Sequence, residues 1–512
     1  MSKEKFIESL NAGYAFQGKS IVMGTAIFNG EPIPNTLIKI PLKSLTRHGL
    51  IAGATGTGKT KSLQVLAEQL SNNGIPSLVM DLKGDLSGLA QAGSNNKHVE
   101  WRHGMIGIPY EAGAKPVELL SLSSEKGVKL RATVSEFGPV LISKILDLND
   151  TQAGIMAVTF KYCDDNKLPL LDLKDLKKVL QFAVGDGKEE FIENYGAMSS
   201  TSVNTIVRKV IELEQQGAEM FFGELSFDVK DLLKKSSDGK GIINIIRLTD
   251  IQDRPKLFST FMLSLLAEVY STFPEEGDMD QPKLCIFIDE AHLVFSTASK
   301  ALSEQIEAII KLIRSKGVGI FFVTQNPTDV PDAVLSQLGL KIQHALRAFT
   351  AKDRTEIKKT AQNYPISEFY KTDEVLTSLG IGEALVSALN EKGIPTPLAA
   401  TLMRAPETRM DILSASEIDE IISRSNLVAK YNTAIDSKSA YEILEGKIDK
   451  SQEKEAQDKL KEEQDKARKA TDRVRKEGST MESLTKNTMV RQIGRTVFRE
   501  LARGILGVLG VK

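Results

Sequence analysis

The chain has 512 residues, of which 41% are hydrophobic and 26% are charged, an ordinary composition for a globular protein. It excludes collagen-like, globally disordered and disulfide-rich classes of protein. The 66 lysines and arginines nearly balance the 67 aspartates and glutamates, so the net charge is −1, which excludes a uniformly basic nucleic-acid-binding protein but allows a local basic patch.

The two cysteines, Cys163 and Cys285, lie far apart in apolar segments. We therefore expect buried thiols in a reducing compartment, the cytoplasm. No apolar signal-peptide stretch follows the charged start of the chain, and no run reaches the roughly 18 apolar residues that a membrane span needs. The histidines form no cluster with zinc-ligand spacing. The sequence thus predicts no integral membrane segment and no metal site built by the protein alone.

Residues 1–48 are expected to form a short N-terminal β segment, and residues 49–114 the first part of an α/β core. The predicted strands are Ile21–Phe28, Thr36–Ile40, Gly49–Ala52 and Pro76–Asp81, and the predicted helix runs from Lys59 to about Asn72. A strand, a glycine-rich loop, a helix and a second strand in this order open a βαβ unit with a parallel sheet.

Residues 115–238 differ in character, because their apolar residues recur at helical spacing and they carry no chemical motif. The predicted helices are Ala132–Leu148, Thr151–Cys163, Leu173–Phe182 and Ser202–Gln216. We interpret this segment as a helical insertion in the α/β core.

The strand pattern resumes in residues 239–405, the second part of the core. The predicted strands are Gly241–Leu248, Lys283–Asp289, Val318–Thr324, Leu340–Ala348 and Gly382–Leu389, and the predicted helices are Asp253–Ser271 and Ser299–Ser315. Several of these strands are continuous apolar runs, which is typical of parallel strands buried on both faces. The predicted fold class is therefore α/β with a mainly parallel sheet.

Residues 406–480 leave this pattern and are predicted to form a helical, charged linker region. Acidic and basic residues mix at close spacing over 447–477, as in a solvated helix with i,i+4 ion pairs or a flexible linker. Residues 481–512 are predicted to form a basic amphipathic tail helix with arginines four apart from Arg491 to Arg503. The tail either docks on a neighbouring subunit or binds an anionic surface.

A phosphate-loop motif, G-x-x-x-x-G-K-[ST], lies between the first predicted core strand and its helix. It comprises Gly53, Ala54, Thr55, Gly56, Thr57, Gly58, Lys59 and Thr60. The glycines let backbone N–H groups turn toward an anion, and the helix points its positive end at the phosphates. Lys59 is expected near the β- and γ-phosphates, and Thr60 is expected to be a ligand of Mg²⁺. We assign these residues, with the adjacent Lys61, to nucleotide binding.

Asp289 and Glu290 end the apolar strand that begins near Lys283. Asp289 is expected to hold Mg²⁺ through water, and Glu290 to polarise the attacking water as a general base. The guanine-reading motif N-K-x-D is missing from the chain. The predicted ligands are therefore ATP and Mg²⁺ rather than GTP.

Two further strand ends carry polar side chains. Gln325 follows Val318–Thr324 and is expected to contact the γ-phosphate or to orient the water. Asp81 ends the strand after the phosphate-loop helix and is assigned to the nucleotide site, where a supporting hydrogen bond is favoured over direct catalysis. Both assignments rest on the rule that parallel strands deliver their carboxyl ends to one crevice.

The segments Gly53–Thr60, Ile288–His292 and Ser315–Val330 together resemble the HerA/FtsK superfamily of ring ATPases, most closely the bacterial HerA-like proteins of the YjgR type. The resemblance covers residues 10–405. It implies a RecA-like P-loop ATPase core, a homohexameric ring and ATP-driven translocation along double-stranded DNA.

By position, the resemblance implies that Lys59, Thr60, Asp289, Glu290 and Gln325 are the ATPase residues. Ring ATPases also take an arginine finger from the neighbouring subunit. Arg347 and Arg354 are the favoured candidates, and Arg314 is a third.

One departure from the family pattern and two alternative functions accompany this hypothesis. HerA proteins carry an N-terminal β-barrel that docks a nuclease, and 48 residues before the core are too few for it, so a nuclease partner is not established. The ATPase could instead act on a protein or membrane-associated partner. A monomeric helicase, suggested by Asp289–His292, would need a second RecA-like lobe, and we find one core.

Overall fold

The computed structural model describes residues 2–295, 300–433, 435 and 437–478; the predicted tail helix, residues 481–512, lies outside them. The chain divides into two compact units, Met1–Leu444 and Glu445–Lys512. Across the described ranges, no helix combines the length and the apolar character that crossing a membrane requires.

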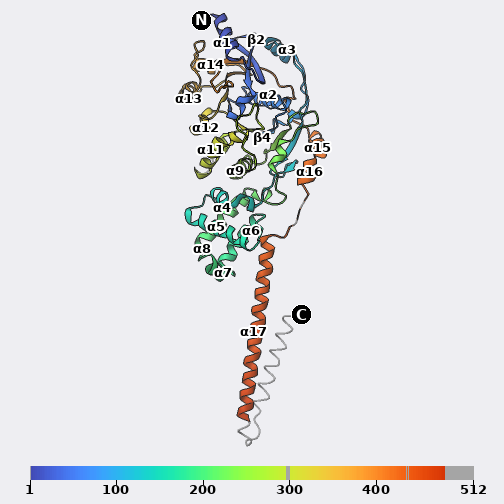
Figure 1. Cartoon of the computed structure of the whole chain (residues 1–512), viewed down its shortest axis with the longest axis vertical. Helices are drawn as coiled ribbons and strands as arrows, with labels where there is room; N and C mark the ends of the chain where they lie inside the picture. Colours follow the sequence, from blue (N-terminus) through green and yellow to red (C-terminus); the bar gives the residue numbers. More distant parts are fainter. Residues whose placement is uncertain (1, 296–299, 434, 436, 479–512) are drawn as a thin grey trace. The chain divides into compact units, whose positions relative to one another are not determined.

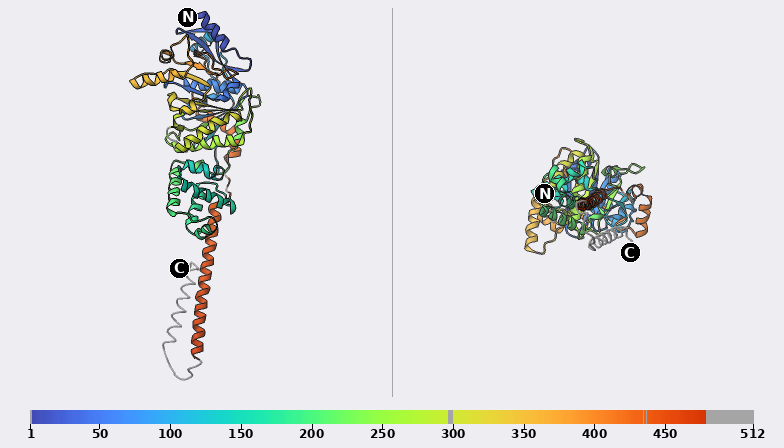
Figure 2. Two further views of the ribbon diagram at one scale, coloured as in Figure 1. Left: turned by 60° about the vertical axis from the view of Figure 1, so that its left-hand side comes forward. Right: turned by 90° about the horizontal axis from the view of Figure 1, so that it is seen from below.

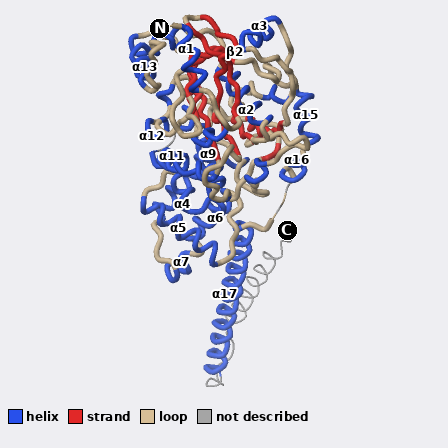
Figure 3. Tube along the Cα trace, turned by 45° about the horizontal axis from the view of Figure 1, so that its top comes forward, coloured by secondary structure: helices blue, strands red, loops and turns tan. Residues whose placement is uncertain are grey.

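A single sheet of twelve strands, counted over the described residues, organises the first unit (Figure 3). The strands are β1 (Ser20–Phe28), β2 (Glu31–Pro41), β3 (Gly49–Ala52), β4 (Ser77–Asp81), β5 (Val117–Ser121), β6 (Val128–Lys129), β7 (Ile243–Arg247), β8 (Leu284–Ile288), β9 (Val318–Thr324), β10 (Leu340–His344), β11 (Glu383–Ser387) and β12 (Ala399–Met403). Their order is β2-β1-β12-β11-β10-β3-β9-β8-β4-β7-β5-β6.

The pairing is parallel from β10 to β6 and antiparallel from β2 to β10. Strands β3, β4, β8 and β9 are buried along their whole length, because the parallel part is covered on both faces. The rings of Phe287 and Phe321 stack across β8 and β9 with centroids 5.0 Å apart. The predicted α/β class with a mainly parallel sheet is confirmed.

Helices connect the strands and follow the sheet. Around the sheet they are α1 (Lys3–Gly13), α2 (Lys59–Asn72), α3 (Lys97–Ile106), α9 (Pro255–Thr272), α10 (His292–Phe295), α11 (Lys300–Ile313), α12 (Asp332–Leu335), α13 (Ala351–Gln362) and α14 (Thr372–Ser378). After the sheet come α15 (Ala415–Arg424), α16 (Asn426–Tyr431) and α17 (Ala440–Gly478).

Five helices between β6 and β7 form one cluster, visible in Figure 1 and again in Figure 2. They are α4 (Val134–Ile145), α5 (Asp150–Asp165), α6 (Leu173–Val184), α7 (Lys188–Asn194) and α8 (Ser200–Gln215). Helices α4, α5, α6 and α8 match predicted helices. The segment 115–238 is not helical throughout, however, because β5 and β6 at its start extend the sheet beside β7.

Helix α1 and strand β12 are among the elements of the antiparallel region that the sequence analysis did not predict. Helix α1 has few apolar residues, but it buries Phe6 and Leu10 completely in the core. Strand β12 pairs with β1, which lies near the start of the chain, and with β11, from which a segment containing Pro395 and Pro397 separates it. Both elements are stabilised by tertiary packing rather than by a strong local pattern.

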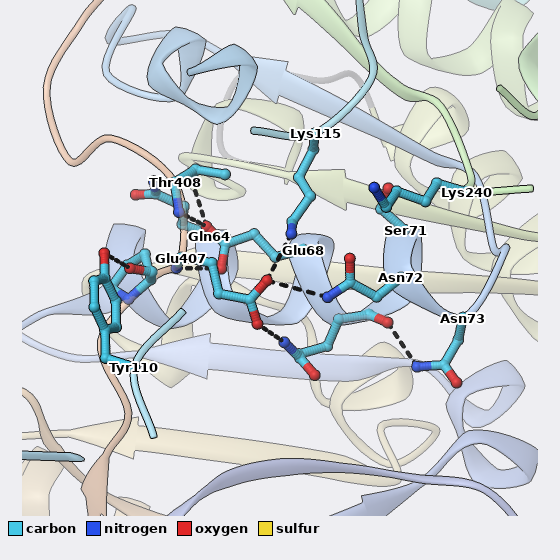
Figure 4. Close-up of polar contacts among 12 residues, drawn as sticks. Gln64, Glu68, Ser71, Asn72, Asn73, Tyr110, Lys115, Lys240, Glu407 and Thr408 are labelled. Atoms are coloured by element: carbon cyan, nitrogen blue, oxygen red, sulfur yellow. Dashed lines mark hydrogen bonds and ion pairs between the residues drawn. The ribbon is translucent and has the colours of Figure 1, made fainter. Parts of the chain in front are cut away.

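The chain after β12 is fastened to α2 by a polar network around Glu68 and Glu407 (Figure 4). The Glu68 carboxylate accepts the backbone N–H groups of Glu407 and Thr408 at 2.9 and 2.8 Å. The Glu407 carboxylate accepts hydrogen bonds from Lys115 at 2.6 Å and from Arg404 at 3.0 Å. The side chains of these two cations are 4% and 9% exposed, so removing Glu407 would leave two buried charges without their partner.

We therefore expect Glu407→Ala to lower the free energy of unfolding by about 3 kcal/mol, as for other broken buried ion pairs. The measurement is urea unfolding. Lys161→Ala, which removes an exposed i,i+4 pair with Asp165, is the matched control and should cost under about 0.5 kcal/mol. An equal, small loss in both variants would show that the network adds no more than a surface pair.

Candidate functional site

The predicted phosphate loop connects β3 to α2 and is anchored on both sides. The Gly53 N–H donates to the Thr324 carbonyl at the end of β9 at 3.3 Å, and the Ala54 N–H donates to the Ala345 carbonyl after β10 at 2.9 Å. The loop thus lies at the carboxyl edge of the parallel strands, where ligands of open α/β sheets bind.

Glycine is required at two positions of this loop. Gly53 has φ +151°, and a Cβ there would lie 2.5 Å from the Cβ of His344. Gly58 has φ +115° and begins α2. The tip residues Thr55 and Gly56 are exposed. The result is a backbone cradle open to solvent, which fits an incoming phosphate chain.

Lys59 is buried, and its ammonium group lies over the loop, donating to the Ala54 carbonyl at 3.1 Å. Burial lowers the pKa of this amine, and the nearby Lys83 lowers it further, whereas Glu290 and Asp289 raise it. Thr60 is half-buried in the first turn of α2. The loop, the ammonium group and the helix N-terminus together form an anion-binding arrangement.

Lys61, also predicted to bind nucleotide, has another partner. Its ammonium group donates to the Met410 carbonyl at 2.8 Å and to the Gln64 side chain at 3.1 Å. Burial lowers the pKa of this amine. Any contact of residue 61 with a phosphate therefore falls to its backbone N–H, because its side chain is committed to the segment after β12.

Asp289 follows β8 and is 3% exposed. Its Oδ1 accepts the Glu290 N–H at 2.9 Å, whereas its Oδ2 is buried and has no hydrogen-bond partner among the described residues. Burial and the neighbouring Glu290 carboxylate raise the pKa of Asp289 to about 7. A buried, unpartnered carboxylate oxygen fits an Mg²⁺ site.

The described residues contain no group of three or more His, Cys, Asp and Glu side chains able to hold a metal ion. An ion at Asp289 would therefore need phosphate oxygens, water and a hydroxyl such as that of Thr60 for its other ligands.

Glu290 has φ +49°, an uncommon backbone conformation for a residue other than glycine. Its side chain is almost buried and forms an ion pair with Lys83. His292 approaches the other oxygen, with Nδ1 3.2 Å from Oε2. Lys83 thus holds one carboxylate oxygen of Glu290, whereas Oε2 is buried and accepts no hydrogen bond among the described residues.

Asp81 ends β4, beside β8, and organises the turn that follows it. Its Oδ1 accepts the N–H groups of Gly84 and Asp85 at 2.7 and 3.2 Å, and its Oδ2 accepts the N–H of Leu86 at 3.1 Å. Burial raises its pKa to about 6. This turn carries Lys83, the residue that pairs with Glu290.

Gln325 is exposed immediately after β9. Because β9 pairs with both β3 and β8, Gln325 lies at the same sheet edge as Gly53 and Asp289.

The three arginines lie elsewhere. Arg347 donates to the carbonyls of Thr377 and Leu379 at 3.1 and 3.5 Å. Arg354 is exposed on α13. Arg314 follows α11, where its guanidinium lies 3.8 Å from Asp278. Of the three, Arg347 is the one tied to backbone carbonyls of its own chain.

Two contributors were not singled out from the sequence. Lys83 lies in a turn two residues after a strand, and nothing local signals that it reaches Glu290. His344 is buried, its Nδ1–H donates to the Glu383 carbonyl and its Nε2 accepts from the Ser62 hydroxyl, both at 2.9 Å. Burial lowers the pKa of His344 to about 4, so it is a neutral brace behind the phosphate loop.

Comparisons with known proteins agree with this architecture. The family model of the helicase HerA-like C-terminal region matches residues 28–512. The DNA double-strand break repair helicase HerA of Sulfurisphaera tokodaii is 23% identical over 357 residues, covering 68% of this chain and 64% of the relative. A probable helicase of Methanocaldococcus jannaschii is 26% identical over 384 residues, covering 69% and 66%. The match thus spans just under two thirds of these relatives' length.

Among solved structures, the plasmid coupling protein TrwB bound to a non-hydrolysable ATP analogue aligns with a TM-score of 0.51 at 15% identity, covering 81% of this chain and 96% of that chain. TrwB bound to a GTP analogue gives the same values. This likeness establishes the fold, a RecA-like P-loop ATPase core. Together with a family model that matches most of the chain, it shows that the protein belongs to the HerA-like C-terminal helicase family.

Proposed function

We propose that this protein is an ATP hydrolase that acts as a hexameric ring motor on double-stranded DNA. The observation that carries the proposal is the gathering of Lys59, Asp289 and Glu290 beside an open phosphate loop at one sheet edge. These are the groups that binding and hydrolysing a nucleoside triphosphate require.

We assign the following roles in ATP hydrolysis to residues of this chain. The backbone of residues 53–60 and the Lys59 ammonium group bind the phosphates. Thr60 and Asp289 hold Mg²⁺, which when bound neutralises charge on the β- and γ-phosphates. Glu290 accepts a hydrogen bond from the attacking water and takes its proton, and Gln325 contacts the γ-phosphate.

Two neighbouring side chains restrict the carboxylate of Glu290. One carboxylate oxygen is occupied by Lys83 and the other lies near His292. Glu290 must turn from Lys83 toward the water before it can accept a proton. We propose that Lys83 holds the carboxylate ready for this turn.

The ring and the DNA substrate are inferred from relatives and from the site. The curated relatives are named as helicases, one of them for DNA double-strand break repair. We propose Arg354 as the finger that a neighbouring subunit supplies, because it is exposed on α13, whereas Arg347 is bound within its own chain.

A second candidate function is ATP hydrolysis coupled to a protein or membrane-associated partner. The observation that favours it is the long charged helix α17, which is largely exposed. Dependence of hydrolysis on DNA separates the two functions.

Glu290→Gln should reduce ATP hydrolysis by at least about 100-fold, because the amide cannot accept the proton of the water, while ATP binding should persist. The wild-type rate should rise on adding duplex DNA and lose this stimulation as salt increases. The measurement is phosphate release across a salt series, with nucleotide binding measured in parallel. Hydrolysis indifferent to DNA at every salt concentration would rule out the DNA motor and favour the second function.

Arg354→Ala should lower the hydrolysis rate by about 10³-fold if it is a trans-acting finger. Mixing this variant with Glu290→Gln should restore part of the activity, because mixed rings contain interfaces with an intact glutamate and an intact arginine. Arg208→Ala, an exposed arginine of α8, is the control and should leave the rate unchanged. Failure of the mixture to regain activity would exclude Arg354 as the finger.

A further inference from the structure

A basic cleft of about 530 Å³ lies at the edge of the sheet opposite the phosphate loop. Arg47, Lys311, Arg314 and Lys341 line it, together with uncharged polar side chains such as Gln337 and Asn363. No aspartate or glutamate among the described residues lines it. We call this feature the basic cleft.

The basic cleft is separate from the ATP site. Arg47 precedes β3 and Lys341 lies near the start of β10, whereas the phosphate loop follows β3 and Ala345 follows β10. In a parallel pair such as β3 and β10, the amino ends and the carboxyl ends form opposite edges. The four-residue strand β3 alone separates them by about 13 Å. A phosphate bound in the cleft is therefore not a phosphate of the ATP in the same subunit.

Two of the four cations that line the basic cleft, Arg47 and Lys311, have no carboxylate partner among the described residues. Lys311 is exposed on α11, and Arg47 is half-buried; neither forms an ion pair within the described ranges. The Lys341 ammonium group donates to the Asn363 carbonyl at 2.9 Å, and Arg314 has Asp278 at 3.8 Å. The cleft thus concentrates positive charge in a chain whose net charge is −1.

The fold holds this charge in place. Two glycines pack against Arg47. A Cβ atom added to Gly393 would lie 3.1 Å from Nη1 of Arg47, and a Cβ atom added to Gly339 would lie 3.1 Å from the Cβ of Arg47. The adjacent His48 is buried, donates through Nε2 to the Ile310 carbonyl at 2.9 Å and accepts the Ile320 N–H through Nδ1 at 3.0 Å. The backbone next to Arg47 is therefore fixed by the two hydrogen bonds of His48.

We propose that the basic cleft binds the phosphodiester backbone of nucleic acid. Four cations from separate segments of the chain exceed what one phosphate ion needs, and they suit successive phosphates of a strand. Ser336, Gln337 and Asn363 supply polar groups that contact phosphate and sugar without reading bases. The inference rests on the proposed DNA motor and adds to it the surface that contacts the duplex.

The test is binding of a fluorescent duplex of about 30 base pairs by the full chain across a salt series. In the double variant Arg47→Gln/Lys311→Gln, binding should weaken and the slope of log K against log salt should fall by about 2 for each subunit that contacts the duplex. The matched control is Lys161→Gln/Arg208→Gln, which removes two exposed cations from the helical cluster and should leave the slope unchanged. Thermal unfolding and DNA-independent hydrolysis of both variants report whether each chain has folded.

The outcomes are distinguishable. If the wild type binds duplex and both variants keep the wild-type slope of log K against log salt, the basic cleft is not the DNA surface, and the proposed motor function stands. If the slope falls equally in the cleft variant and in the control variant, the salt dependence comes from general surface charge, and the proposal is overturned. If the wild type binds no duplex even at low salt, both the cleft proposal and the DNA motor fall, and the ATPase reading remains.

Discussion

The phosphate loop is held by two backbone hydrogen bonds, from Gly53 to β9 and from Ala54 to the chain after β10, and the rest of the site depends on them. They fix the loop between the strand that delivers Gln325 and the strand that delivers His344. His344 in turn binds Ser62 on α2 and the Glu383 carbonyl of β11. The phosphate loop, helix α2 and strand β11 are therefore linked through His344 into one unit around the open loop.

Charge balance is the second constraint on this edge of the sheet. Asp289 and Glu290 raise the pKa of both Lys59 and Lys83, and Lys83 in turn lowers the pKa of Asp289. Asp289 nevertheless has a pKa of about 7 because burial outweighs this attraction. Because burial and neighbouring charges act on the pKa of Asp289 in opposite directions, a new charge nearby would shift that pKa, as expected in a site for a highly charged substrate.

The core strands were predictable because their patterns are local. The apolar runs of β8 and β9 and the glycine motif after β3 are read directly from neighbouring residues. The contacts of Lys61 with Met410 and of Glu68 with residues 407 and 408 join positions some 340 residues apart, and no local pattern encodes them. Lys83 escaped prediction for a related reason, since Glu290 reaches it only through the pairing of β4 with β8.

Strand β9 links the two edges of the sheet. Near its start the Ile320 N–H binds His48, beside Arg47, and at its end the Thr324 carbonyl accepts from Gly53 of the phosphate loop. The strand is buried throughout, and close-packed interiors transmit displacement rather than absorb it. His48 also binds the carbonyl of Ile310 near the end of α11, the helix that carries Lys311. On the proposed function, a shift of the loop on hydrolysis would thus reach Arg47 and Lys311 through one strand and one neutral histidine. A motor needs such a path, because the energy released at one edge must move a polymer held at another.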